Sequence, residues 1–152
     1  MKKTALVLIG IYLGIVFFMP KESIFYKIEE YLPVKITADL SSTPISLNIK
    51  KADIYYAGIK SATIKNSEIY PFLFYNEAKI NIFVNSLDIN LSGIKLIYTP
   101  FVPFKIFVKG KDITGDIELK NRKIHILFLH PQNEIKDFLQ KTKKGYELNE
   151  RF

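Results

Sequence analysis

Residue types that carry enzymatic chemistry are scarce in this sequence. The chain has no cysteine, which excludes disulfides, thiolate metal sites and a cysteine nucleophile. Its two histidines, His125 and His130, lie five positions apart, which places them on opposite faces of a continuing strand, and neither has a convincing carboxylate neighbour. We therefore expect His125 to face solvent and His130 to contribute to a helix cap, and we expect no metal site.

Three acidic residues, Asp112, Asp116 and Glu118, form the remaining group with catalytic potential. Asp116 and Glu118 would share one strand face, a spacing compatible with acid–base catalysis. Lys120 follows on the same face, so we interpret the acids as part of a solvated, charge-paired surface. The sequence also lacks a nucleophile elbow, a phosphate-binding loop and a zinc-protease motif. We predict a protein that is not an enzyme and that has no catalytic residues and no cofactor.

The basic character of the chain, with a net charge of +7, has three interpretations. Lysines often alternate with apolar residues, as in Lys35-Ile36 and Lys105-Ile106, which is typical of a solvated sheet face that resists edge-to-edge pairing. Attraction to anionic lipid headgroups is the second interpretation. Nucleic-acid binding is the third, but no recognition motif or arginine cluster supports it. We favour the first and expect no nucleic-acid partner.

Residues 1–20 predict a membrane anchor. A basic start at Lys2 and Lys3 precedes an uncharged run from Thr4 to Met19, and Pro20 ends the run. The predicted anchor comprises the large apolar residues Leu6, Val7, Leu8, Ile9, Ile11, Leu13, Ile15, Val16, Phe17 and Phe18.

Two fates are open for this segment: a cleaved signal peptide or a retained anchor. The large side chains of Phe17, Phe18 and Met19 disfavour a signal-peptidase site, so we favour the anchor. The run of 16 residues is short for a span, which needs about 20, unless flanking lysines snorkel and the bilayer thins. The positive-inside rule places Lys2 and Lys3 in the cytoplasm. We thus predict a single-pass protein of the cell inner membrane with a periplasmic C-terminal domain.

Residues 21–33 predict a juxtamembrane amphipathic helix that Pro33 ends. Its apolar face contains Ile24, Phe25, Ile28, Tyr31 and Leu32. The helix would either lie on the bilayer surface or pack against the following domain. We favour packing, because Glu29 and Glu30 would face anionic lipid unfavourably.

Residues 34–145 predict a β-rich extracytoplasmic domain, because apolar residues there alternate with polar ones. The alternation changes parity at Lys50-Lys51, which predicts a bulge or a tight bend. A possible apolar face contains Ile80, Ile82, Val84, Phe104, Ile106 and Val108. Turns are predicted at 41–44, Ala57-Gly58, Lys65-Asn66-Ser67, Ser92-Gly93, Lys109-Gly110-Lys111 and Lys120-Asn121-Arg122.

These patterns predict a mainly β fold: an N-terminal transmembrane helix, then an antiparallel, twisted or rolled β-sheet, then a short C-terminal helix. The C-terminal helix is expected from Gln132 to Lys143, burying Ile135, Phe138 and Leu139. Residues 146–152 are expected to form a flexible tail. Residues 70–76 are too aromatic for an exposed loop, so we expect a buried connection or the lip of a groove.

One stretch carries a family resemblance. Residues 110–119 read GKDITGDIEL and are followed by KIHILF at 123–128. With the preceding anchor and repetitive β-domain, residues 1–130 resemble the type II secretion protein N family and, more distantly, AsmA-like envelope proteins. The resemblance implies an extended, twisted sheet with an apolar concave face and no catalytic residues. The chain is shorter than expected for either family.

Two functions are compatible with this sequence. The first is a non-enzymatic, membrane-anchored accessory component of a secretion or envelope-assembly apparatus, with the cytoplasmic membrane and other envelope proteins as partners. The second is a lipid-binding or lipid-transfer module whose apolar β-trough shields acyl chains, as in the lipopolysaccharide-export bridge proteins. A closed core with paired strand edges would favour the first, and an open apolar groove would favour the second.

Overall fold

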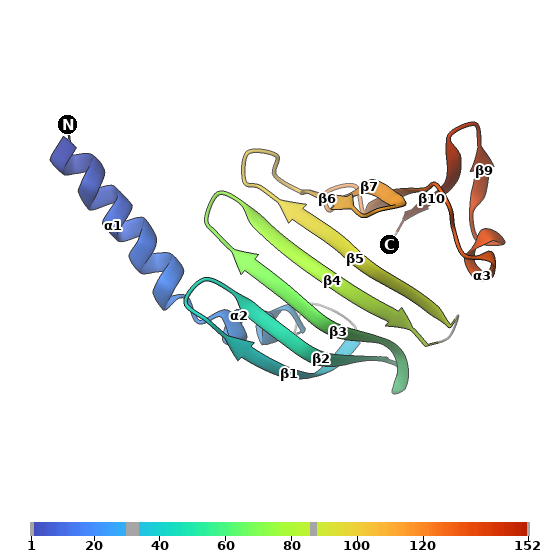
Figure 1. Ribbon diagram of the computed structural model, residues 1–152, viewed down its shortest axis with the longest axis horizontal. Helices are drawn as coiled ribbons and strands as arrows, with labels where there is room; N and C mark the ends of the chain where they lie inside the picture. The colour runs from blue at the N-terminus through green and yellow to red at the C-terminus, as the bar shows by residue number, and fades with distance from the viewer. Residues whose placement is uncertain (1, 30–33, 86–87, 152) are drawn as a thin grey trace.

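Alternation of apolar and polar residues from Val34 onward produces one continuous antiparallel sheet (Figure 1). The computed structural model describes residues 2–29, 34–85 and 88–151. The ten strands are β1 (Val34–Ser42), β2 (Leu47–Tyr56), β3 (Ile59–Pro71), β4 (Asn76–Val84), β5 (Ile89–Tyr98), β6 (Lys105–Lys109), β7 (Ile113–Glu118), β8 (Lys123–Phe128), β9 (Gln140–Thr142) and β10 (Gly145–Arg151). Each strand from β1 to β8 pairs with the next, and β10 lies between β8 and β9. The predicted mainly β, antiparallel class with an N-terminal helix and a short C-terminal helix is confirmed.

Two helices precede the sheet: α1 (Lys2–Phe18) and α2 (Lys21–Glu29), separated at Pro20. Lys21 is buried, and its Nζ donates a hydrogen bond to the carbonyl oxygen of Val16 at 3.0 Å. This bond occupies one of the carbonyls left without a partner where a helix ends. Lys21 therefore caps α1, whereas the sequence suggested that it extends toward headgroups.

By length and hydropathy, no described helix taken alone is sufficient to cross a membrane. The pair formed by α1 and α2, which is bent by 64° at the break, meets the same criterion together.

Helix α2 packs against the first strand of the sheet, the alternative that the sequence favoured. The Ser42 hydroxyl donates to a Glu22 carboxylate oxygen at 2.8 Å, and the Tyr26 hydroxyl donates to the Ala38 carbonyl at 3.4 Å. Phe25 is half-buried and lines a small cavity with Leu47 and Ile69. The expected end of this helix, residues 30–33, lies outside the described part of the chain.

The C-terminal region differs from the sequence-based expectation. The helix expected from Gln132 to Lys143 is only one turn, α3 (Asn133–Lys136), and β9 follows it. Where a flexible tail was expected at 146–152, the structure instead has strand β10 over Gly145–Arg151. Ile135 is buried as expected, but Phe138 is 63% exposed. Cross-strand pairing with β8 orders the expected tail, because Tyr146 and Leu148 add apolar surface to the sheet, and the pairing of β9 with β10 limits the expected helix to one turn.

β-Bulges interrupt the pairing at neighbouring positions of β2, β3 and β5. The parity change predicted at Lys50-Lys51 is confirmed as a shift of register between β1 and β2. The turns predicted at Lys65-Asn66-Ser67 and Ser92-Gly93 are wrong, because both segments lie inside strands, where the register shifts by one residue. Asn66 and Gly93 have positive φ angles of 46° and 69°, so residue types that are common in turns form bulges here.

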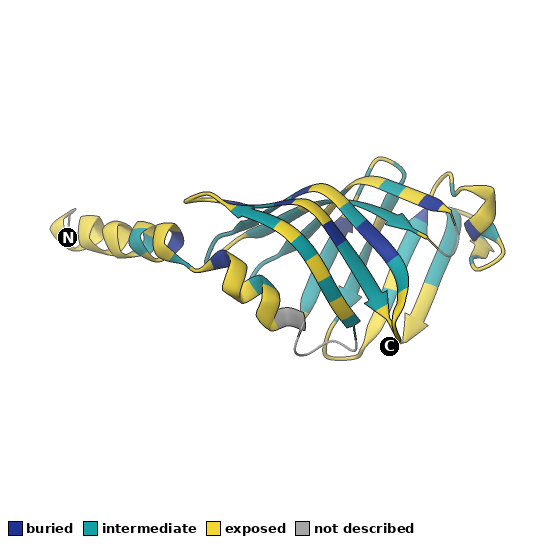
Figure 2. Cartoon of the chain, turned by 90° about the horizontal axis from the view of Figure 1, so that it is seen from below, coloured by how far each residue is buried: buried dark blue, intermediate teal, exposed yellow. Residues whose placement is uncertain are grey.

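The bulges bend the sheet. One side of the sheet is mainly polar and the other mainly apolar. At each bulge two consecutive residues, such as Lys50 and Lys51, have their side chains on the polar side, and the residues before and after them have theirs on the apolar side. The extra residue lengthens the polar side and curves the sheet toward its apolar side. Figure 2 shows the resulting arch of strongly twisted strands, with α1 projecting from one end.

Candidate functional site

The side of the sheet that faces inward along this arch is mainly apolar, although the register also places Ser42, Asn76 and Glu150 on it. Cross-strand register aligns eight residues, one from each strand from β2 to β8 and one from β10, with no polar residue among them. This row is Leu47, Ile69, Ala78, Leu96, Val108, Gly115, Ile126 and Leu148. A second row from β1 to β5 is Ala38, Ala52, Ile64, Ile82 and Leu91. We call the surface formed by these residues and their same-side neighbours the apolar face.

Helices cover the apolar face only at its two ends. Leu47 is 2% exposed where Ile24 and Phe25 of α2 approach it. At the other end, Ile89 and Phe128 form a buried cluster with Ile135 of α3. Between these ends most aliphatic side chains, such as Ile82 and Leu96, are half-buried, whereas Val108 and Ala52 are buried, and no described helix lies over them. The sheet therefore has two small core regions joined by an apolar strip that no described helix covers.

The structure places five of the six predicted apolar-face residues on this surface. Register brings Ile80, Ile82 and Val84 of β4 to the same side as Ile106 and Val108 of β6. The sixth, Phe104, precedes β6, is 58% exposed and has a positive φ of 64°. The sequence did not single out Ile64, Leu91, Leu96, Ile126 and Leu148 for this face. Alternation identifies such residues within strands, but only strand pairing shows which of them share a face.

The predicted anchor residues all lie in α1. Nine of the ten are among the exposed large hydrophobic residues, with exposed fractions from 45% for Leu13 to 89% for Phe18. The exception is Val16, which is 2% exposed next to the capped end of the helix. A helix that is apolar around its whole circumference requires an apolar environment, and the described chain covers little of it.

The segment at residues 70–76 is more exposed than expected. It ends β3 and forms the connection to β4, in which Phe74 is 57% exposed and Tyr75 is 45% exposed. The expectation of a buried connection is therefore wrong for these two aromatic side chains. The Phe74 ring stacks on Tyr12 of α1, with ring centroids 5.8 Å apart.

The opposite side of the sheet, which we call the polar face, is a surface of paired charges. Asp53 on β2 lies 2.8 Å from Lys60 Nζ and 3.2 Å from Lys51 Nζ, and it accepts a hydrogen bond from Thr63 at 3.0 Å. The hydrogen bond from Lys60, with those from Thr63 and Lys51, lowers the pKa of Asp53 from 3.8 to about 2.

The acidic residues singled out from the sequence are part of this polar face. Lys105 Nζ of β6 lies 3.2 Å from Asp116 and 3.7 Å from Glu118. Lys105, rather than the expected Lys120, thus pairs with both acids. The pKa of Glu118 is lowered by a hydrogen bond from Asn121 and by the charges of Lys105 and Lys123. These contacts are consistent with structural charge pairing.

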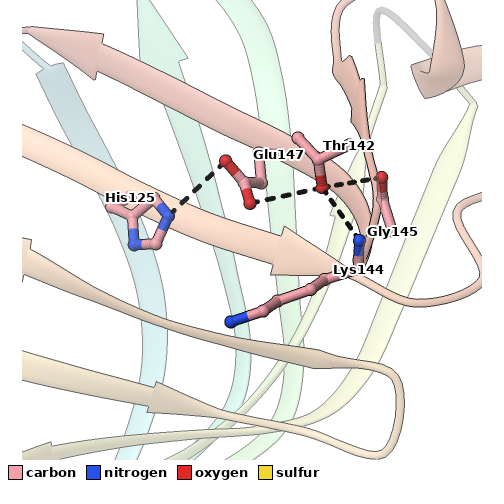
Figure 3. Close-up of polar contacts among 5 residues, drawn as sticks. All are labelled: His125, Thr142, Lys144, Gly145 and Glu147. Atoms are coloured by element: carbon pink, nitrogen blue, oxygen red, sulfur yellow. Dashed lines mark hydrogen bonds and ion pairs between the residues drawn. The ribbon is translucent and has the colours of Figure 1, made fainter.

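The two histidines occupy separate surface positions. Figure 3 shows His125 facing Glu147 of β10, with 4.0 Å between His125 Nε2 and a carboxylate oxygen, and Thr142 donating to Glu147. His130 pairs with Asp112 at 3.2 Å instead of capping α3, whose first turn has no side-chain cap. In the described residues, no three metal-ligating side chains lie together.

A side-chain network on the polar face links the bulges of β3 and β5. Asn81 of β4 donates from Nδ2 to the Asn66 carbonyl at 2.9 Å and accepts from the Gly93 N–H at 2.8 Å. The Asn81 N–H donates to the Ser67 hydroxyl at 2.9 Å. Asn81 therefore forms hydrogen bonds with backbone groups that the bulges remove from regular strand pairing. These bonds stabilise the bend of the sheet, which sets the orientation of the apolar face.

Comparison with known proteins assigns no family to this chain. No family model, no curated protein and no solved structure matches it. The apolar face and the exposed surface of α1 are the features from which its function can be inferred.

Proposed function

We propose that this chain is a membrane-anchored, non-enzymatic lipid-binding module whose apolar face holds acyl chains. One observation carries the proposal. The row of eight residues from β2 to β8 and β10 is apolar, and between the ends covered by α2 and α3 no described helix covers it. A sheet face of this kind is stable when another apolar layer covers it.

Acyl chains match the chemistry of this face. The middle of the face consists of aliphatic residues such as Ile82, Leu96 and Ile126, which offer no hydrogen-bonding side chains. Each buried methylene contributes about 0.8 kcal/mol, so one acyl chain lying along several strands would gain a substantial free energy without any polar contact. The polar face, with its paired charges, would remain in water.

The membrane assignment rests on α1. Its exposed apolar surface favours insertion in a bilayer, and Lys2 and Lys3 at its start favour a cytoplasmic N-terminus. In a double-membrane cell this arrangement would place the sheet in the periplasm, next to the inner membrane. The 17 residues of α1 extend about 25 Å at 1.5 Å per residue, so the bilayer would have to thin locally.

The test is lipid retention by matched variants of the full chain. Ile82→Asp places a charge on the apolar face, and Phe83→Asp places the same charge at the next position, which faces the polar side. We expect Ile82→Asp, purified in mild detergent, to lose most of the co-purified lipid that mass spectrometry finds with the unmodified protein, and Phe83→Asp to retain it. Ile82→Ser serves as a milder variant if Ile82→Asp unfolds. Equal lipid retention by all variants would refute the proposal.

A component of an envelope-assembly or secretion apparatus is the second candidate, and one observation favours it. β9 pairs only with Gly145–Glu147, so the outer edge of β10 from Leu148 to Arg151 has no partner strand within the described chain. An open edge of this kind can accept a strand from a partner protein. Cross-linking from Glu150 in cells would yield a protein adduct if this edge is used, and none otherwise.

A further inference from the structure

Connections at one end of the sheet carry most of its exposed apolar side chains. These connections are 43–46, 72–75, 99–104 and 119–122, and Figure 1 shows the first three on the side next to α1. Their exposed large hydrophobic residues are Ile45, Phe74, Tyr75, Phe101, Val102, Phe104 and Leu119. The other end also exposes apolar side chains, such as Ile59 at 72%, but these lie away from α1.

Two of these connections form an aromatic row with α1. Tyr12 of α1 stacks on Phe74 with 5.8 Å between ring centroids and an interplanar angle of 10°. Phe74 stacks in turn on Phe101 at 6.1 Å and 19°. Despite these contacts, Phe101 remains 78% exposed. The row therefore extends the apolar surface of the helix onto the β3–β4 and β5–β6 connections.

The position of Tyr12 fixes how deep this row would lie in a bilayer. Tyr12 precedes the last residue of α1, Phe18, by six positions, or roughly 9 Å along the helix axis. The whole helix is about 25 Å long, shorter than the hydrocarbon core of about 30 Å. A bilayer that α1 crosses must therefore include Tyr12, and with it the stacked rings of Phe74 and Phe101.

We propose that the β3–β4 and β5–β6 connections insert their aromatic tips into the same phospholipid bilayer as α1, in the acyl-chain region below the headgroups. This inference rests on the proposed membrane location of α1. Phenylalanine has no polar group and favours the apolar interior of a bilayer, so this region suits Phe74 and Phe101. Insertion would place the edge of the apolar face at the membrane surface, where Tyr98 and Ile106 pair beside the β5–β6 connection. Acyl chains would then reach the face without crossing water.

The backbone of the β5–β6 connection suits this location. Backbone N–H groups without partners are costly in lipid. Pro100 and Pro103 have no N–H group, and the Val102 N–H donates to the Thr99 carbonyl at 3.1 Å. Lys120 and Arg122, exposed on the β7–β8 connection at the same end, are placed to contact anionic headgroups.

Tryptophan quenching by brominated acyl chains tests this insertion directly, since the chain contains no tryptophan. The full chain would be reconstituted in vesicles of phosphatidylethanolamine and phosphatidylglycerol, with and without bromine on the acyl chains. The variants are Phe74→Trp and Phe101→Trp at the proposed contact, and Ile59→Trp as an equally accessible control at the opposite end. We expect strong quenching and a blue-shifted emission from the first two variants and little quenching from the control.

Leu13→Trp, in α1, separates the inference from the proposed function on which it rests. Quenching of Leu13→Trp without quenching of Phe74→Trp and Phe101→Trp beyond the control would overturn loop insertion alone. Absence of quenching at Leu13→Trp as well would overturn both loop insertion and the membrane location of α1. Quenching at all three positions, with the Ile59→Trp control unquenched, supports the inference.

Discussion

At the scale of single residues, Asp53 is a carboxylate held by three neighbours on the polar face. Lys60, Lys51 and Thr63 all lie within hydrogen-bonding or ion-pair distance of it, and its side chain is only 15% exposed. Because its folded pKa of about 2 lies below the ordinary value of 3.8, the folded state binds the proton at Asp53 more weakly than the unfolded state does. The ion pairs therefore stabilise the fold only where Asp53 is ionised.

Because the folded pKa of Asp53 is lower than the unfolded pKa, the stabilisation by its ion pairs should depend on pH. The difference in melting temperature between the unmodified protein and Asp53→Asn should be full above pH 3.8 and should shrink as the pH falls toward 2. Thermal melting of the full chain in detergent over a pH series would measure it. Asp39→Asn, at an exposed position of β1, is the control. A difference that stays constant down to pH 2 would contradict the assignment.

Asn81 gives a second prediction at this scale. Replacing it with alanine removes the side-chain bonds to the bulges at Asn66 and Gly93, which should cost about 1 kcal/mol because water can replace part of these contacts. Urea unfolding monitored by circular dichroism would measure the loss. Asn90→Ala, on the polar side of β5, is the matched control. If the two variants lose equal stability, Asn81 does not hold the bulges together.

Individual side chains show where the sequence was sufficient. Alternation alone placed Ile80, Ile82 and Val84 together, because a strand fixes which of its own residues share a side. The partner of Asp116 was missed, because Lys105 is brought near it only by the pairing of β6 with β7. The sequence around Asn66 predicts a turn where the structure has a bulge, because both features use residues that tolerate a positive φ.

At the scale of elements, β10 decides how the sheet ends. It pairs with β8 from Tyr146↔Phe128 to Arg151↔Lys123, and Leu148 packs against the cluster around Ile89 and Phe128. The burial of Tyr146 and Leu148 and the whole pairing of β8 with β10 therefore depend on a segment that the sequence predicted to be a flexible tail.

Truncation tests the role of β10. Removing residues 145–152 should lower the free energy of unfolding by about 3 kcal/mol or more, because Tyr146 and Leu148 no longer bury apolar surface. Removing only residues 150–152 leaves both side chains in place and is the control. Chemical unfolding of the three proteins would measure the difference. Unchanged stability of the longer truncation would instead indicate a tail.

Elements were predicted well where the pattern of apolar and polar residues continued over many residues, and poorly where the pattern was short. Nine- and ten-residue strands such as β1 and β2 contain enough alternation to be recognised. Residues 132–143 contain three apolar positions at helical spacing, but only Asn133–Lys136 is helical. Pairing of β9 with β10 ends α3 early, and such long-range pairing is not visible in a local pattern.

At the scale of the whole molecule, an open sheet with one apolar face is joined to an exposed apolar helix. The sequence predicted an antiparallel, twisted or rolled sheet but not the order of its strands, because alternation within a strand does not show which strands pair. The order from β1 to β8 follows the chain, and β10 then lies between β8 and β9. The resemblance to envelope proteins and the location in the inner membrane remain predictions.

The central claim is that acyl chains contact the apolar face and not the polar face. A photoreactive benzophenone amino acid incorporated at Ile106, on the apolar face, or at its neighbour Phe107, on the polar face, would test it in cells. After irradiation, mass spectrometry of the full chain would identify covalent adducts. The proposed function predicts lipid adducts from position 106 and none from position 107. Equal lipid adducts from both positions, or only protein adducts from position 106, would contradict it.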